Sequence, residues 1–378
     1  MRAGSWGTIV AISVGMILLI GSAGLGVAQP EPAAAPAEES QVDALFRDYS
    51  HDDTPGAVVA VIQNGKVVHQ KAFGLANLEQ GTPCAAQTKF RIISLTKAFT
   101  AMAIMILHER GKLDIDSAIG QYLPDYPKGD RITIRQLLTH TAGVQEPVLN
   151  EEMLEIVPKR NTPLAQRYIT CRDEPLEFSP GERWSYSNAG YIVLGYLVEK
   201  VSGQSYDAFL RDNIFRPLGM SDTGCDRPDT ILRHRAAGYA RAGEAYKNAP
   251  YVDMSIFGPS GSIYSTIEDM ALWDQAWYGE KLVKADLLRQ AFTRAKLNSD
   301  TTADYGFGWV LATNRGLEEV RATGMAPGCR AQIVRIPAQK FSVIILSNCE
   351  SLGVLDLAHK IVEIYLGRIM TRREPSAG

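Results

Sequence analysis

The 378-residue sequence has little that would indicate a metal centre or a nucleic-acid partner. Its six histidines form no His-Glu-x-x-His pattern, and no two of its cysteines have the close spacing of a zinc knuckle. The formal net charge is only −3, and there is no basic stripe with interleaved aromatic residues. Short internal repeats of the solenoid or propeller kind are missing too. We therefore expect no metal, no other cofactor and no nucleic-acid partner.

Cysteine is also scarce, with five residues, and an odd number leaves at least one thiol outside any disulfide. The sequence leaves open whether Cys171 and Cys225 pair with each other. Hydrophobic residues make up 46% of the chain, which is typical of a globular protein, and the length allows one large domain or two.

The N-terminus has the features of an export signal. Met1-Arg2 supplies a positive charge, residues 8–26 are uncharged and mostly apolar, and Gly26-Val27-Ala28 has the small residues of a cleavage site. We expect a signal peptide over residues 1–28 and hence an extracytoplasmic protein, either periplasmic or secreted. An uncleaved membrane anchor is the alternative, because an apolar run of this length can span a bilayer. Residues 29–41, rich in proline, alanine and glutamate, are expected to form a linker.

Two pairs of β-rich segments lie towards opposite ends of the folded region. Residues 57–63 and 67–73 flank Asn64-Gly65, which is the strongest short signal for a hairpin. A second pair covers residues 332–336 and 341–346, around a turn that contains proline. Apolar residues recur at helical spacing over residues 95–110, 134–139, 189–201, 205–214, 266–277 and 354–370.

This order of elements predicts an α+β fold. We expect one antiparallel sheet that is built from both chain ends and flanked by helices, with a mainly helical subdomain inserted at roughly residues 112–262. An alternation of strands and helices, which would indicate a parallel sheet, is not seen.

Ser94 and Lys97 form the first candidate catalytic pair. They are three positions apart at the start of a run that is apolar on nearly every side, which indicates a buried helix. At this spacing two helical side chains share a face, and the helix N-terminus favours developing negative charge. A desolvated lysine binds its proton less tightly and can then act as a base, so the pair has the chemistry of an activated nucleophile. Helix capping by Ser94, with Lys97 reaching to solvent, is the structural alternative.

A second candidate element is the sequence Tyr186-Ser187-Asn188, which follows a Pro180-Gly181 turn and precedes a helix. A phenol can carry a proton, and an amide can hold a substrate carbonyl, when both project into one cleft. Capping of the following helix by Ser187 or Asn188 is the alternative.

Together these elements make the sequence similar to the penicillin-recognising serine hydrolases. The similarity extends over roughly residues 45–365. Within that superfamily the sequence resembles the branch of class C β-lactamases, D-alanyl-D-alanine carboxypeptidases, D-aminopeptidases and β-lactamase-like esterases. The matching phrases are "FRIISLTKAFTAMAIMILHERGKLDIDSAIGQYLP", "ITIRQLLTHTAGV", "PGERWSYSNAGYIVLGYLVEKVSG", "IFRPLGMSDT", "GPSGSIYSTIEDMALW" and "YGFGW". The resemblance implies a β-lactamase/transpeptidase-like domain over residues 42–370, followed by a tail over residues 371–378.

The resemblance also implies roles for the candidate residues. Ser94 corresponds to the acylated nucleophile, Lys97 to the adjacent base and Tyr186 to a second proton carrier. Asn188 corresponds to a residue that binds the carbonyl or amide side of the substrate. The oxyanion hole would use the backbone N–H of Ser94 and another on the strand that carries the third motif.

The third motif departs from the family pattern. Relatives usually carry Lys-Thr-Gly or His-x-Gly, and the matching stretch here is Ala322-Thr323-Gly324, followed by Met325. Thr323, Gly324 and Met325 remain candidate substrate-binding residues, whereas Ala322 replaces the cation or imidazole. Arg321 is not expected to substitute for it, because neighbouring residues of a strand point to opposite faces. Recognition of a substrate carboxylate is therefore in doubt.

For one histidine and several aromatic residues the sequence indicates a structural role or does not decide between core and cleft. His140 is expected to close a helix and pack structurally, and Trp273 is expected to lie in the core. Residues 307–309 are a candidate wall of the site. The sequence does not decide between cleft and core for the remaining candidates, Trp184, Trp309, Tyr239 and Tyr264.

We expect an exported serine hydrolase that cleaves an ester or amide of a small molecule or peptide through an acyl-enzyme on Ser94, and an esterase or peptidase is the leading interpretation. A class C-like β-lactamase or D-Ala-D-Ala carboxypeptidase is the alternative. A catalytically impaired ligand-binding module is the alternative of another class, motivated by Ala322. An α/β-hydrolase is rejected, because Gly258-Pro-Ser-Gly-Ser262 lacks the final glycine of Gly-x-Ser-x-Gly. The oligomeric state is left open.

Overall fold

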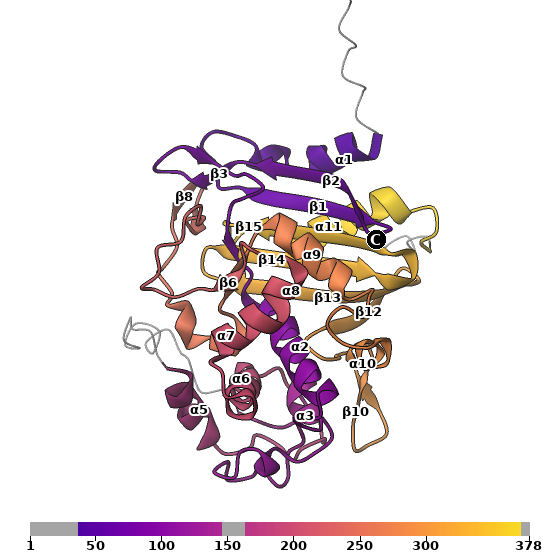
Figure 1. The fold of residues 1–378 in the computed structure, drawn as a ribbon. Helices are drawn as coiled ribbons and strands as arrows, with labels where there is room; N and C mark the ends of the chain where they lie inside the picture. Colours follow the sequence, from indigo (N-terminus) through magenta and orange to yellow (C-terminus); the bar gives the residue numbers. More distant parts are fainter. Residues whose placement is uncertain (1–36, 146–162, 372–378) are drawn as a thin grey trace, which may run out of the picture. The chain divides into compact units, whose positions relative to one another are not determined.

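The centre of the fold is a six-stranded antiparallel sheet with the order β12-β13-β14-β15-β1-β2 (Figure 1). The computed structural model describes residues 37–145 and 163–371, and the sheet takes its strands from both ends of that part of the chain. The strands are β1 (Ala57–Gln63), β2 (Lys66–Phe73), β12 (Val310–Asn314), β13 (Leu317–Ala326), β14 (Cys329–Ile336) and β15 (Phe341–Ser347). Because β1 pairs with β15 along its whole length, the expected sheet built from both chain ends is confirmed.

Both predicted hairpins are present in this sheet. Asn64 and Gly65 join β1 to β2 with φ values of 51° and 77°, the positive values that a type I′ turn requires. Arg315 and Gly316 have φ values of 49° and 85° between β12 and β13. The second predicted hairpin, β14–β15, turns through a short 3-10 helix at Pro337–Gln339.

Helices cover both faces of the sheet, because its strands carry apolar residues on both sides. The odd-numbered residues of β1 contribute to one core cluster and the even-numbered residues to another. On the first face lie α1 (Ala37–Leu45) and α11 (Val354–Leu366), and on the second lie α2 (Thr96–Glu109) and α9 (Ile267–Ala276) (Figure 1).

Helix α1 corrects one predicted boundary. The linker was expected to extend to residue 41, but α1 begins at Ala37, so the prediction is wrong for residues 37–41. The side chain of Val42 in α1 is fully buried against the α11 side of the sheet, and this tertiary contact stabilises a helix whose own sequence is mostly polar. Residues 1–36, and with them the expected signal peptide, lie outside the described residues.

The region between the two halves of the sheet is mainly helical, as expected. The predicted helix over residues 205–214 consists of α7 (Tyr206–Leu210) followed by a π-helical turn at Arg211–Phe215. The other helices are α3 (Ile134–Leu138), α5 (Leu164–Arg172), α6 (Asn188–Ser202), α8 (Arg216–Leu218) and α10 (Ala285–Ala291). Short strands complete the fold: β3 (Leu75–Asn77), β4 (Thr82–Pro83), β5 (Phe90–Arg91), β6 (Gly224–Cys225), β7 (Tyr239–Ala242), β8 (Ala245–Asn248), β9 (Ile263–Ser265), β10 (Ala295–Lys296) and β11 (Thr302–Ala303).

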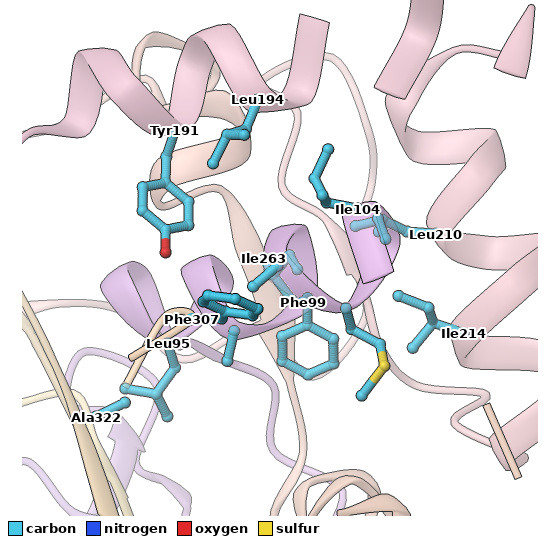
Figure 2. Close-up of a cluster of buried hydrophobic side chains, with 14 of the residues drawn as sticks. Leu95, Phe99, Ile104, Tyr191, Leu194, Leu210, Ile214, Ile263, Phe307 and Ala322 are labelled. Carbon is cyan, nitrogen blue, oxygen red and sulfur yellow. The ribbon is translucent and has the colours of Figure 1, made fainter. Parts of the chain in front are cut away.

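Helix α2 joins the sheet to the helical region. Residues 96–107 of this helix are all buried, which agrees with its apolar sequence on every side. Phe99 and Ile104 of α2 share one cluster with Leu194 of α6 and Leu210 of α7, while Leu95 lies next to Ala322 of β13 (Figure 2). The sheet and the helical region therefore share a continuous core.

Two further expectations concern thiols and membranes. The cysteines of the described residues are present as thiols, and Cys171 and Cys225 are not joined to each other. In the part of the chain that the structure describes, each helix is too short or too polar to cross a bilayer.

Candidate active site

Ser94 lies in the turn that leads into α2. Residues Ile93–Leu95 form a 3-10 turn and α2 begins at Thr96, so Ser94 lies just before the regular helix and not inside it. Ile93 has a φ of 48°, which is rare for a β-branched residue and is held in place by the surrounding packing.

Strand β13 approaches this turn very closely, at Gly324. A Cβ atom on residue 324 would lie 2.3 Å from the carbonyl oxygen of Ile92 and 3.1 Å from Cβ of Ile93. No side chain fits there, so only glycine lets the third motif contact the turn that holds Ser94.

Lys97 lies on the same face as Ser94, as their spacing predicted. Its Nζ is 3.4 Å from Ser94 Oγ, 2.7 Å from Asn188 Oδ1 and 2.8 Å from the backbone carbonyl oxygen of Ser260. Lys97 is only 1% exposed, so its Nζ meets protein oxygens instead of water. The Tyr186 and Tyr191 rings lie 4.6 and 5.6 Å from Nζ, within cation–π range, and Tyr191 points from α6 towards α2 (Figure 2).

Tyr186 and Asn188 meet the pair from the opposite side of the site. The Tyr186 hydroxyl donates to Ser94 Oγ over 2.9 Å, and Asn188 receives the hydrogen bond from Lys97. Between them, Ser187 caps α6, since its Oγ accepts the backbone N–H of Gly190 over 3.0 Å. The capping interpretation therefore applies to Ser187, while its two neighbours reach the predicted nucleophile and base.

The remaining third-motif residues divide between the two faces of β13. Ala322 is buried on the α2 side, where it packs beside Leu95 (Figure 2). Thr323 donates from Oγ1 to Gln332 Oε1 over 2.7 Å, and Met325 is 62% exposed.

Arg321 does not replace the missing cation. Its guanidinium donates to Glu319 Oε1 over 2.8 Å, and Glu319 in turn contacts His359 Nε2 of α11 at 2.9 Å. The predicted orientation of Arg321, away from the side chain of Ala322, agrees with this pairing on the α11 side of the sheet.

A cleft of about 420 Å³ opens above Ser94. Most of its side chains are apolar or aromatic. Its lining includes Ser94, Tyr186 and Asn188, together with Ile93, Trp184, Phe257, Ser260, Gly261, Tyr305, Gly308, Val310, Arg321, Ala322, Thr323 and Met325. Strand β12 pairs with β13 only as far as Val310 opposite Arg321, so Ala322, Thr323 and Met325 of β13 line the cleft beyond the end of β12.

The other aromatic candidates are divided between the core and the cleft. Trp273 is in the core, as expected. Of residues 307–309, the candidate wall of the site, only Gly308 lines the cleft, together with Trp184, while Phe307 and Trp309 are in the core. A Cβ on Gly308 would lie 2.8 Å from Cα of Ala98, which explains the glycine between two core aromatics. The cleft lining does not include Tyr239, which donates to Glu79, or Tyr264.

Three parts of the site were not predicted. The backbone carbonyl of Ser260 holds Lys97, and the side chains of Phe257 and Tyr305 line the cleft. The only signal for Ser260 was the glycine- and proline-rich turn around it, which a search for side-chain chemistry passes over.

Burial raises the pKa of Tyr191 and of Tyr305 well above 10, so both phenols are neutral and add no negative charge beside Lys97. Among the described residues, no group of three or more His, Cys, Asp or Glu side chains is arranged to hold a metal ion.

A serine that contacts both a buried lysine and a tyrosine, in the turn before a buried helix under an antiparallel sheet, defines the class of penicillin-recognising serine hydrolases. The Beta-lactamase family model matches residues 42–364. The chain therefore belongs to the β-lactamase family of serine hydrolases, and the resemblance found in the sequence is confirmed.

Individual relatives agree with this family. A penicillin-binding protein of Bacillus subtilis is 30% identical over 335 residues, which cover 83% of this chain and 72% of that protein. Protein flp of Staphylococcus aureus is 27% identical, and the alignment covers 83% of this chain but only 64% of flp. Among solved structures, a penicillin-binding protein from Bacillus halodurans has a TM-score of 0.74 at 28% identity, with 85% of this chain and 98% of that chain covered. A D-amino acid amidase from Ochrobactrum anthropi, with a TM-score of 0.75 at 22% identity over 88% of this chain and 99% of that chain, shows the same fold.

Proposed function

We propose that this protein hydrolyses an ester or amide of a small molecule or peptide through an acyl-enzyme on Ser94, as an esterase or peptidase. The observation that carries the proposal is the contact of one hydroxyl with two proton carriers. Ser94 Oγ lies 2.9 Å from the Tyr186 hydroxyl and 3.4 Å from Lys97 Nζ at the floor of the cleft.

Acylation would begin with attack of Ser94 Oγ on the substrate carbonyl carbon. With Lys97 in its neutral form, the contact to Ser94 would run from the serine hydroxyl to Nζ, so that the lysine takes the proton. Tyr186, on the other side of Ser94 Oγ, would pass a proton to the leaving alcohol or amine. Asn188, fixed by Lys97, would orient the carbonyl side of the substrate.

The oxyanion would be stabilised by the backbone N–H of Ser94 and by one on β13, which Gly324 brings close to the Ser94 turn. Water would then hydrolyse the ester on Ser94. Tyr186, left as the phenolate by acylation, would accept the proton of the water, and the protonated Lys97 would return a proton to Ser94 Oγ as the ester bond breaks. Both half-reactions would use the same proton carriers.

The substrate class follows from the charges around the cleft. Residue 322 is alanine, and the Arg321 guanidinium is paired with Glu319. Arg321 lines the cleft but is already paired, so a carboxylate on the substrate would leave water without an unpaired cation to meet it, which costs free energy. Esters or amides without a carboxylate next to the scissile bond are therefore the preferred substrates.

A class C-like β-lactamase or D-Ala-D-Ala carboxypeptidase is the second candidate. Thr323 and Gly324 retain two positions of the third motif, and the B. subtilis relative is a penicillin-binding protein by name. Penicillin labelling compared with ester hydrolysis separates the two candidates.

A catalytically impaired ligand-binding module is disfavoured by the hydrogen bonds of the site. A binding module has no need to bury Lys97 against Asn188 and Ser260 and to direct Tyr186 at Ser94. Export remains part of the proposal, on the basis of the leader-like residues 1–28, and the cellular location would be periplasmic, secreted or membrane-tethered.

The test combines p-nitrophenyl acetate hydrolysis with intact-mass analysis after exposure to a fluorophosphonate and to penicillin G. Wild type should hydrolyse the ester and gain one fluorophosphonate adduct, and Ser94→Ala should do neither. Ser299→Ala, an exposed serine outside the cleft, serves as the matched control and should behave as wild type. An adduct that persists in Ser94→Ala would remove Ser94 as the nucleophile, and a wild type without adduct or hydrolysis would support the binding module.

A further inference from the structure

His140 follows Thr139, the C-cap residue of α3, and adopts a left-handed backbone conformation, with a φ of 61°. The residue is 2% exposed and lies between α3 and the loop that carries Tyr186. Left-handed backbone is uncommon for histidine, so the surrounding structure holds the residue in this conformation. The proposed reaction assigns no proton to it.

Two of the polar groups of His140 contact the residues on either side of Tyr186. Its backbone carbonyl accepts the N–H of Ser185 over 3.0 Å, and its Nδ1 accepts the N–H of Ser187 over 3.2 Å. The imidazole also lies against the Tyr186 ring, with centroids 4.6 Å apart. His140 therefore contacts the tyrosine loop before, at and after residue 186.

The Nδ1 contact requires one particular form of the ring. An Nδ1 that accepts an N–H carries no hydrogen, so the imidazole is neutral with its proton on Nε2. Burial, followed by the positive charge of Lys97, holds the pKa of His140 well below its usual value and favours this form.

The rest of the imidazole is enclosed by aromatic rings. Tyr305 and Tyr191 lie 4.6 and 5.1 Å away between ring centroids, and Nε2 is buried without a hydrogen-bond partner among the described residues. A group enclosed in this way is a poor general base, because neither nitrogen is presented to the cleft. The arrangement suits a fixed acceptor and a packing surface.

We propose that His140 is a positioning residue for the reaction, which holds the Tyr186 loop so that the phenol hydroxyl stays directed at Ser94. This inference rests on the proposed function, because it requires Tyr186 to carry a proton. The effect of His140 on the rate is exerted through Tyr186 and not by proton transfer from the imidazole.

The first test compares two replacements of His140. Asparagine tolerates left-handed backbone and offers its Oδ1 in place of Nδ1, whereas leucine fills a similar volume without an acceptor. With p-nitrophenyl acetate, His140→Leu should lower kcat roughly 10- to 100-fold with little change in KM, since a small displacement of a catalytic group has that effect. His140→Asn should recover most of the loss, and equal kcat values for the two variants would overturn the proposal.

The second test is a double-mutant cycle with Tyr186→Phe. If His140 acts through the tyrosine hydroxyl, His140→Leu should change the rate of Ser94 acylation by less than about twofold once that hydroxyl is gone. The acylation rate is measured by intact-mass analysis of fluorophosphonate labelling, which detects a single modification of Ser94 and therefore works even when turnover is slow. An equally large loss in both backgrounds would overturn the proposal and leave His140 a purely structural role.

A stability control completes the design. Ile345→Ala in β15 removes a fully buried side chain on the α11 side of the sheet and should destabilise the fold without lowering kcat at 25 °C. A drop in kcat as large as that of His140→Leu would overturn the inference. If Tyr186→Phe alone leaves the acylation rate unchanged, the proposed role of Tyr186 as a proton carrier fails. If Tyr186→Phe lowers the acylation rate but His140→Leu does not, only the positioning role of His140 is overturned.

Discussion

At the scale of single residues, the identity of residue 322 sets which substrates the cleft receives. A cation placed there would lie on the α2 side of β13 in the cleft that contains the candidate nucleophile, whereas Arg321, which also lines this cleft, is paired with Glu319. Because residue 322 is alanine, this site lacks the positive charge that the lysine of a Lys-Thr-Gly motif supplies.

Ala322→Lys should shift selectivity towards substrates that carry a carboxylate. A charge-assisted hydrogen bond contributes about 1.5–3 kcal/mol, so the ratio of penicillin G acylation to p-nitrophenyl acetate hydrolysis should rise by roughly tenfold or more. Ala322→Met, of similar length and uncharged, is the matched control. A ratio that rises equally in both variants would attribute the effect to shape rather than charge.

The pH dependence of stability should also carry the contribution of His140. In the unfolded chain a histidine takes up a proton below pH 6.5, whereas the buried His140 remains neutral to a lower pH. The unfolded state then binds more protons, so the free energy of unfolding falls as pH decreases below 6.5, by up to about 1.4 kcal/mol per pH unit from this group.

Urea unfolding between pH 5 and 7.5 tests this contribution. The slope for His140→Asn should be shallower than that for wild type, while the carboxylates and His69 are common to both proteins and cancel in the comparison. Identical slopes would mean that His140 takes up its proton as readily in the folded protein as in the unfolded chain, which the hydrogen bond from Ser187 N–H to Nδ1 contradicts.

Which residues of the site were predictable depends on the chemistry that each supplies. Ser94, Lys97, Tyr186 and Asn188 contribute side chains of recognisable reactivity, and the structure brings them together. Ser260 contributes a backbone carbonyl, which any residue type could supply, so its side chain gives no signal and only the glycine- and proline-rich turn around it does.

At the scale of elements, the contact between β13 and the Ser94 turn depends on one absent side chain. Gly324→Ala would place a methyl group 2.3 Å from the Ile92 carbonyl oxygen, so the strand and the turn must separate. Such a shift displaces the oxyanion donors from the nucleophile, and we expect acylation of Ser94 to slow by about 100-fold.

Gly279→Ala is the matched control, because a Cβ at residue 279 has open space within 4 Å. Fluorophosphonate labelling rates and thermal unfolding are measured for both variants. A Gly324→Ala protein that labels at the wild-type rate would show that the approach of β13 is not needed for acylation.

Elements with strong local patterns were predictable, and those that depend on tertiary contacts were not. The hairpin at Asn64-Gly65 and the buried helix α2 follow from turn chemistry and apolar spacing. Helix α1 was assigned partly to a linker because its polar first turn forms a helix only beside α11. The π-helical turn at Arg211–Phe215 has the same origin, since local sequence does not distinguish it from a regular helix.

At the scale of the whole molecule, the continuous core couples the helical region to the sheet. One cluster of buried residues includes Ile344 and Leu346 of β15, Phe99 of α2 and Leu194 of α6. Neither part can unfold without exposing apolar surface of the other. We expect one cooperative transition, with far-UV circular dichroism and tryptophan fluorescence changing at the same urea concentration.

Leu194→Ala tests this coupling from the helical side. The fully buried leucine should cost about 2–5 kcal/mol, and both signals should shift together to lower urea. Ile231→Ala, at a residue that is 94% exposed, should leave the midpoint unchanged. Two separate transitions after Leu194→Ala would mean that the sheet is stable without the helical region.

The pairing of β1 with β15 also fixes an order of events during synthesis. Ala57 is opposite Ser347, so β1 leaves the ribosome about 290 residues before its partner β15. Contacts of such high sequence separation form slowly, and until then both apolar faces and one edge of β1 are uncovered. A nascent chain that stops short of β15 therefore has no route to the finished sheet, and it depends on a chaperone or on rapid completion to avoid aggregation.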